Sequence, residues 1–154
     1  MDEDPSHARQ DAMLHGTVTR LRLRRQRHLL RFLWASGRAI LQARRSPGHR
    51  GSRVGRGADG AYWTVTLWDA PVNRQAFRNA GAHTRVMPHL RQWCDEAAYG
   101  RWQQHGDVLP DWAEAHRHLV AAPRFTRVDH PSADHVAKRI PNWSGSEPLP
   151  ESRP

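Results

Sequence analysis

Alternation between unlike side chains predicts two β-strands in this chain. Successive side chains of a strand point to opposite faces of a sheet. Over Thr17–Arg24 the alternation places threonine and leucine on one face and valine and arginine on the other. Ala61–Ala70 is aromatic and β-branched, as strands prefer, and its alternation separates Trp63 from Trp68. We therefore expect these two segments in a sheet whose faces differ in chemistry.

Apolar residues that recur about every 3.6 positions predict the helices. The predicted helices are Gln26–Arg45, a short helix between Asp69 and Gly81, Thr84–Gln104 and Leu109–Ala122. Asp69 and Asp111 are of the residue type that caps a helix N-terminus, and Pro71 suits a first turn. Two weaker strands complete the set, a short glycine-rich one within residues 49–60 and a last one over Arg124–His130.

This order of elements predicts an α+β protein with a ferredoxin-like antiparallel sheet and helices on one face. The uncovered face of such a sheet would need burial elsewhere. A homodimer that stacks two sheets into a dimeric α/β barrel would provide it. We place this domain at residues 15–130, after a disordered N-terminal arm, 1–14, and before a polar, proline-rich tail, 131–154.

Composition narrows the function classes. The formal net charge is +9, yet Lys138 is the only lysine among 24 basic residues, and the arginines are scattered through every element. We therefore do not expect a nucleic-acid interface, although a basic nucleic-acid-binding protein stays open as an alternative. No apolar run approaches the ~18 residues of a membrane span. Cys94 is the single cysteine, which excludes an intrachain disulfide and fits a reducing, cytoplasmic setting.

The junction at Gly81 carries the candidate chemistry. Gly81 is suited to end one helix, so that His83 heads the apolar stripe of the next, with Met87 at i+4. A neutral imidazole there can ligate iron or shuttle a proton. The alternative is that His83 only hydrogen-bonds a carbonyl. The seven tryptophans are likewise open to two interpretations, as core residues or as the walls of a wide, flat cavity.

A family resemblance rests on the aromatic strand "YWTVTLW" and the segment that follows it. Its matching residues are Trp68, Phe77, the Gly81-x-His83 junction, Trp93, Glu96, Arg101 and Trp102. In these residues, and over about residues 16–130, the chain resembles the spheroidene-monooxygenase-like group of the antibiotic-biosynthesis-monooxygenase superfamily. The chain is much shorter than the carotenoid-oxidising enzyme, and Cys94 stands where an aromatic residue is expected. Both departures argue against a carotenoid substrate.

The resemblance implies a small homodimeric enzyme of the monooxygenase type. It would oxidise a small organic or natural-product substrate, binding a hydrophobic or planar ligand between sheet and helices, with haem as cofactor or none. His83 would be the proton shuttle or, if haem is bound, the axial iron ligand. Arg20 or Arg22 would pair with a propionate, or would instead project into the dimer barrel or solvent. The expected pocket residues are Trp63, Trp68, Phe77, Met87 and Trp93. A non-catalytic carrier or sensor of the same ligand is the main alternative.

Overall fold

The computed structural model describes residues 12–145. Its elements are β1 (Met13–Leu23), the 3-10 turn η1 (Gln26–His28), α2 (Leu29–Arg45), β2 (His49–Arg56), β3 (Tyr62–Trp68), α3 (Pro71–Arg78), α4 (Gly81–Trp93), β4 (Cys94–His105), α5 (Trp112–Ala121), β5 (Arg124–Phe125) and α6 (Ala133–Val136). The strands form one sheet in the order β2-β3-β1-β4-β5, and every neighbouring pair is antiparallel. The predicted α+β class and ferredoxin-like sheet are confirmed.

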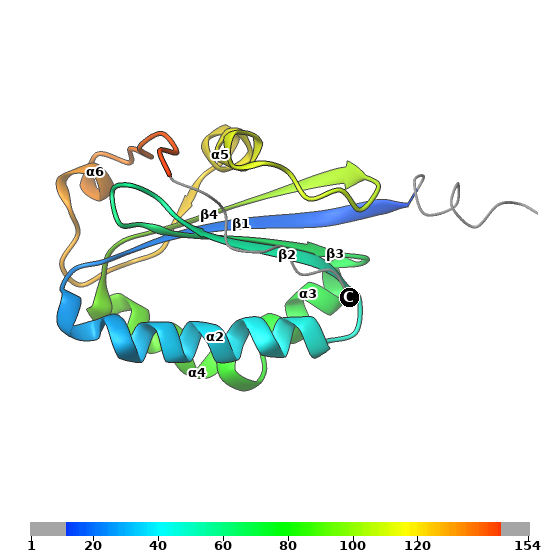
Figure 1. Cartoon of the computed structure of the whole chain (residues 1–154), viewed down its shortest axis with the longest axis horizontal. Coiled ribbons are helices and arrows are strands. Elements are labelled where there is room, and N and C mark those ends of the chain that lie inside the picture. The colour runs from blue at the N-terminus through cyan, green and yellow to red at the C-terminus, as the bar shows by residue number, and fades with distance from the viewer. Residues whose placement is uncertain (1–11, 146–154) are drawn as a thin grey trace, which may run out of the picture.

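The helices cover both faces of the sheet. Figure 1 shows α2, α3 and α4 on one side, with α5 and α6 on the other. The prediction of helices on one face only is therefore wrong. Gly100 shows how closely α5 lies, because a Cβ there would come within 3.0 Å of the Leu119 Cα atom. The chain's own α5 covers the face that a second sheet was expected to bury. A dimer that stacks two sheets is therefore not needed to bury that face.

Strand β4 lies where a helix was predicted. The expected helix Thr84–Gln104 ends at Trp93, and the chain continues as a strand from Cys94. Alanine and glutamine in this segment favour a helix locally, but local propensity yields to tertiary packing. The alternation of Asp95, Ala97 and Tyr99 with Glu96, Ala98 and Gly100 is the strand signal. The predicted last strand, Arg124–His130, shrinks to the two residues of β5.

The segment after residue 130 packs on the domain, in contrast to the tail predicted there. His135 in α6 is buried. Trp143 stacks on Trp112 with ring centroids 4.8 Å apart and meets Trp63 edge-on at 5.6 Å. The folded unit therefore extends at least to residue 145. The predicted N-terminal arm lies outside the described residues up to position 11, and β1 already begins at Met13.

Two apolar cores lie on opposite faces of the sheet. The core under α5 gathers Leu14, Val18, Ala61, Trp63, Val65, Leu67, Ala98, Leu109, Trp112, Ala115 and Leu119. The core under α2 and α4 gathers Phe32, Val86, Leu90, Trp93, Cys94, Ala97 and Val128. The second core fills only part of the space between sheet and helices, and a cavity occupies the rest. Among residues 12–145, no helix has the length and apolarity to cross a membrane.

Candidate functional site

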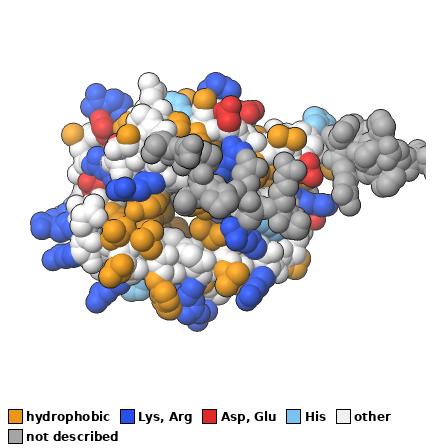
Figure 2. Space-filling model, viewed as in Figure 1, with side chains coloured by type: hydrophobic (Ala, Val, Ile, Leu, Met, Phe, Trp, Pro, Cys, Tyr) orange, Lys and Arg blue, Asp and Glu red, His pale blue; other side chains and the backbone are white. Residues whose placement is uncertain are grey.

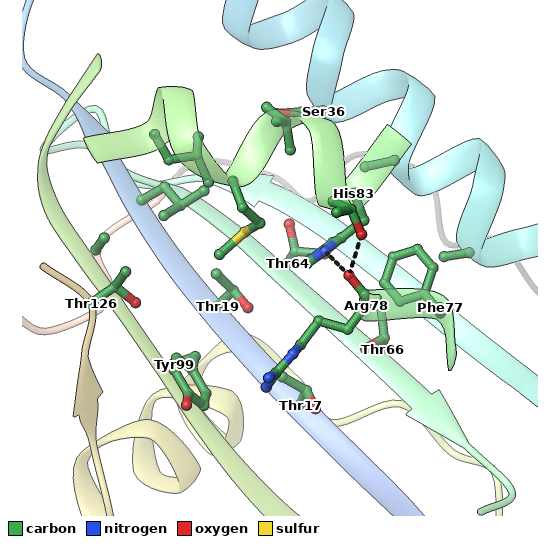
Figure 3. Close-up of a pocket in the computed structure, with 18 of the residues that line it drawn as sticks. Thr17, Thr19, Ser36, Thr64, Thr66, Phe77, Arg78, His83, Tyr99 and Thr126 are labelled. Carbon is green, nitrogen blue, oxygen red and sulfur yellow. Dashed lines mark hydrogen bonds between the residues drawn. The ribbon is translucent and has the colours of Figure 1, made fainter. Parts of the chain in front are cut away.

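A cavity of about 860 Å³ lies between the sheet and helices α2, α3 and α4. Figure 3 shows strand and helix side chains facing one another across it. On the outside, Figure 2 shows hydrophobic side chains around a hollow, with basic side chains about its edge. This volume falls in the range of sites for small organic ligands.

Hydroxyl groups form the strand side of the cavity. The pairing register aligns two rows across β4, β1 and β3, which are Arg101–Thr17–Thr66 and Tyr99–Thr19–Thr64. Directly paired residues of a sheet point to the same face, and all six side chains line the cavity. The alternation predicted for the first and third strands is thus present, and it places the threonines toward the cavity.

Apolar side chains from the helices line part of the cavity. They are Ile40, Phe77, Val86, Met87 and Leu90, and Trp68 at the end of β3 adds to them. Trp68 is fully buried and stacks on Phe77, with ring centroids 5.2 Å apart. One wall therefore offers apolar contact and the other offers hydroxyl groups. This combination suits a flat molecule with an apolar body and polar substituents.

His83 lies at the cavity, at the start of α4. Its Nδ1 atom is 3.1 Å from the Arg78 carbonyl oxygen, and its ring centroid is 4.8 Å from that of Phe77. A carbonyl oxygen can only accept, so Nδ1 carries the proton and donates. In the neutral ring, Nε2 then keeps its lone pair. Burial lowers the pKa of His83, and the charge of Arg78 lowers it further against the opposing effect of the carbonyl bond. His83 is therefore a neutral base at physiological pH.

Gln42 of α2 holds this junction in place. Its Nε2 donates to the Phe77 and Ala80 carbonyl oxygens at 3.1 and 2.8 Å, and its Oε1 accepts from the His83 backbone N–H at 2.9 Å. Gly81 has φ +60°, in the left-handed region, with the Gln42 side chain about 3 Å from where a Cβ would stand. The predicted break at Gly81 is present, although α3 ends earlier, at Arg78.

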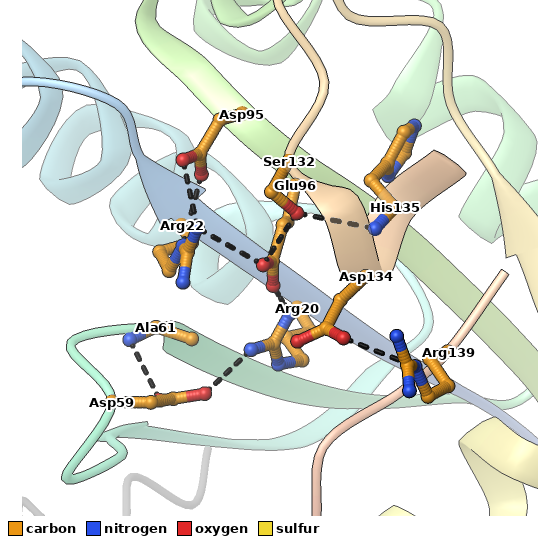
Figure 4. Close-up of polar contacts among 10 residues, drawn as sticks. All are labelled: Arg20, Arg22, Asp59, Ala61, Asp95, Glu96, Ser132, Asp134, His135 and Arg139. Atoms are coloured by element: carbon orange, nitrogen blue, oxygen red, sulfur yellow. Dashed lines mark hydrogen bonds and ion pairs between the residues drawn. The ribbon is translucent and has the colours of Figure 1, made fainter. Parts of the chain in front are cut away.

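Arg20 and Arg22 lie on the opposite face of the sheet, away from the cavity. Figure 4 shows them in a network of ion pairs. Arg20, which is 2% exposed, bonds Glu96 and also Asp59, at 2.5 Å. Arg22 bonds Asp95 at 3.0 and 2.8 Å. Their expected contact with a propionate in the cavity is wrong, because strand alternation turns them to the other face.

The two remaining predicted pocket residues also lie outside the cavity lining. Trp63 belongs to the core under α5. Trp93 packs in the core under α4, where its ring stacks on His89 with centroids 5.2 Å apart. Burial raises the pKa of the Cys94 thiol to about 12, so this cysteine stays protonated and is no nucleophile. Of the predicted pocket set, Trp68, Phe77 and Met87 line the cavity, together with His83.

Several residues that line the cavity were not predicted to do so. They are Thr17, Thr19, Thr64, Thr66, Tyr99, Arg74, Arg78 and Arg101. The threonine positions were visible as one face of each predicted strand, but nothing in the pattern says which face receives a ligand. Tyr99 and Arg101 were hidden by the incorrect helix assignment. Within the part of the chain that the structure describes, no three His, Cys, Asp or Glu side chains gather as a metal site.

Comparison with solved structures identifies the fold. A putative antibiotic biosynthesis monooxygenase from Nitrosomonas europaea matches with a TM-score of 0.52 at 15% identity, covering 63% of this chain and 92% of that one. SnoaB, a cofactor-independent oxygenase from Streptomyces nogalater, matches with 0.52 at 17% identity, covering 65% and 100%. A conserved protein from Methanosarcina mazei Go1 matches with 0.53 at 10% identity, covering 63% and 96%.

The chain has the fold of these proteins. No family model and no curated protein matches its sequence. Identities this low show the fold alone, and a shared fold does not fix a function.

Proposed function

We propose that this protein is a small oxidoreductase of the monooxygenase type that oxidises a planar, largely apolar organic molecule in the cavity between sheet and helices. The observation that carries this proposal is a neutral histidine in the cavity, next to apolar side chains of α4 and opposite two rows of strand side chains that carry four threonine hydroxyls and the Tyr99 hydroxyl. The resemblance to the spheroidene-monooxygenase-like group, and the similarity in fold to a cofactor-independent oxygenase, support the reaction class.

His83 is the proton acceptor in this proposal. The Nδ1–H bond to the Arg78 carbonyl orients the ring, and Nε2 accepts a proton from an acidic O–H or C–H group of the substrate. Removal of that proton leaves an electron-rich anion, and molecular oxygen adds to its carbon to give, after reprotonation, a hydroperoxide. Loss of water from the hydroperoxide breaks the O–O bond and leaves a carbonyl group, so one oxygen atom stays in the product and the other leaves as water. The hydroxyl groups of Thr64 and Thr66 on the facing strand are placed to donate to substrate oxygen atoms.

Haem is the second candidate ligand, and the cavity residues fit it in a different way from that expected. His83 Nε2 would hold the haem iron. The propionate partners would be Arg74 and Arg101, which line the cavity, and not Arg20 or Arg22. Arg101 Nε is buried without a hydrogen-bond partner, as an unfilled anion contact would leave it. Bound haem would supply oxygen activation, while this chain's residues would bind and orient it.

Oxygen uptake with planar phenols and anthrones tests the proposed function. His83→Asn keeps a side-chain N–H donor for the Arg78 carbonyl but removes the base. We expect uptake to fall by two or more orders of magnitude, as for loss of a general base. His89→Asn, on the same helix but outside the cavity lining, is the matched control and should keep full activity. Ligand binding with no oxygen uptake by the unaltered protein would support the carrier or sensor instead.

We further propose that the homodimer forms through α2, since α5 covers the outer face of the sheet. Leu30 and Trp34 of α2 are 80% and 66% exposed, and Leu41 follows on the same helical face. Exposed apolar patches of this kind mark interaction surfaces. Sedimentation at micromolar concentration should show a dimer that Trp34→Glu dissociates. A monomeric unaltered protein would contradict this proposal.

A further inference from the structure

Three arginines gather at one end of the cavity without an acidic partner. Arg74 and Arg78 lie four residues apart on α3, which places them on one helix face. Arg101 projects from β4 in the row that includes Thr17. All three line the cavity. In Figure 3 the Arg78 side chain extends across the cavity toward Thr17.

Three arginines elsewhere, two on β1 and one on α4, have carboxylate partners. Arg20 pairs with Asp59 and Glu96, Arg22 with Asp95, and Arg91 with Asp129 at 2.8 Å. Across residues 12–145, no carboxylate lies within ion-pair distance of Arg74, Arg78 or Arg101. This end of the cavity therefore holds three positive charges without a counter-charge.

Unsatisfied polar atoms lie in the same place. Arg101 Nε and Thr17 Oγ1 are both buried with no hydrogen-bond partner, and the two residues are direct partners across the β1–β4 pairing. Buried polar groups of folded proteins normally have hydrogen-bond partners, so two neighbouring buried atoms without one indicate a binding position for a ligand atom. Tyr99 is adjacent, with the Arg101 guanidinium 5.3 Å from its ring centroid. An oxyanion is the group that satisfies both donors and the positive charge.

The arrangement carries a cost in the free protein. Burial lowers the pKa of Arg74, and the nearby charges of Arg101 and Arg78 lower it further. Like charges held together without a counter-charge destabilise a fold, and sites that do so commonly serve a ligand.

We infer that this cluster of Arg74, Arg78, Arg101 and Thr17 is a carboxylate subsite, so that the planar ligand of the cavity bears a carboxylate. This inference rests on the proposed function for the planar body of the ligand. The carboxylate belongs to an organic acid substrate in this inference. A haem propionate is the other source of the same chemistry, and the experiment separates the two.

Calorimetric titration with 2-naphthoate and its neutral isostere 2-naphthamide tests the subsite on the full chain. We expect the acid to bind at least tenfold more tightly than the amide. Arg74→Gln and Arg101→Gln should each remove most of this preference and leave amide affinity within about twofold. Arg31→Gln, an exposed arginine of α2 outside the cavity lining, is the matched control and should keep the preference.

Thermal stability distinguishes a ligand-binding arginine from a structural one. Arg74→Gln relieves like-charge repulsion, so we expect its melting temperature to be equal to or above that of the unaltered protein. A lower melting temperature with an unchanged preference for the acid would overturn the subsite. Equal binding of acid and amide would also overturn it, while oxygen uptake would still decide the proposed function separately.

Haemin and its dimethyl ester identify the source of the carboxylate. If the carboxylate belongs to an organic acid substrate, His83→Asn leaves the affinity for 2-naphthoate nearly unchanged. The unaltered protein then binds haemin no more tightly than haemin dimethyl ester. Tight haemin binding that both esterification and His83→Asn abolish would instead assign the arginines to haem propionates, and would overturn the organic-acid interpretation.

Discussion

Glu96 is the centre of the buried ion-pair network, and Glu96→Gln should be among the most destabilising single changes in this protein. The carboxylate is 3% exposed and bonds Arg20, which is 2% exposed. It also accepts from Ser132 Oγ at 2.8 Å and lies 3.1 Å from Arg22 Nη2. The network thereby joins β1, β4 and the approach to α6. Glutamine preserves the shape of the side chain but leaves the buried Arg20 with only Asp59 as a charged partner.

The expected loss is about 3–5 kcal/mol, the typical cost of breaking a buried pair and leaving one charge uncompensated. For a chain of this size that loss corresponds to a decrease in melting temperature of roughly 6–20 °C. Urea unfolding followed by tryptophan fluorescence measures it. Asp129→Asn breaks the exposed pair with Arg91, whose side chains are 45% and 34% exposed, and should cost no more than about 1 kcal/mol.

A loss below about 1 kcal/mol for Glu96→Gln would refute the reasoning, because it would mean that Arg20 is solvated or finds another partner. A change in 2-naphthoate affinity would contradict the placement of this network on the face away from the cavity. Both results come from the same purified variant.

Three further predictions concern packing and protonation. Gly100→Ala should lower the free energy of unfolding by about 1–3 kcal/mol, because its Cβ would meet the α5 backbone at 3.0 Å. Gly37→Ala, where a Cβ would have nothing within 4 Å, should raise it by about 0.5–1 kcal/mol. Equal denaturation midpoints for the two variants would contradict this prediction. Trp143→Ala should lower the unfolding free energy by about 2–4 kcal/mol, since its ring packs on Trp63 and Trp112, and an unchanged free energy would restore the interpretation of this segment as a tail. Burial lowers the pKa of His49, His83 and His135, so the unfolded chain binds protons first as the pH falls below 6.5. Stability measured in urea should therefore decrease from pH 7.5 to pH 5.5, and a flat profile would contradict that linkage.

The sequence pattern predicted the fold class because its two best strands have strong alternation. β1 and β3 occupy the predicted positions, and the helix before β2 begins and ends within a few residues of the predicted bounds. Asp111 caps α5 as predicted, accepting from the Glu114 N–H at 2.8 Å. Asp69 does not cap α3, where Ala70 takes the N-cap position and the Asp69 side chain accepts from Asn73 instead. Local signals of this kind are reliable where no distant segment competes for the same residues.

β4 was missed because its stability comes from its neighbours. Alanine and glutamine would favour a helix in an isolated peptide, but here the segment pairs with β1 along its whole length. Gly100 allows α5 to approach the sheet, but this role cannot be predicted until the position of α5 is known. The incorrect helix also hid Tyr99 and Arg101 as cavity residues.

Strand alternation separates two sets of side chains but does not say which set lines the cavity. Arg20 and Thr19 are neighbours in sequence, and only the positions of α2 and α4 decide that Thr19 faces the cavity. For the same reason Trp63 was predicted as a pocket residue, although it lies in the core under α5. The position of His83 near the start of a helix could be predicted because Gly81 marks that helix start locally, independently of the sheet.

The protonation state of His83 in the presence of a ligand tests the central claim, that a neutral base faces a planar molecule in this cavity. Long-range ¹H–¹⁵N spectra of the imidazole groups, with and without 2-naphthol, measure it directly. We predict that Nδ1 carries the proton, that Nε2 is unprotonated at pH 7, and that 2-naphthol shifts His83 Nε2 while leaving His89 unchanged. A proton on Nε2, or a His83 signal that 2-naphthol does not move, would contradict the account.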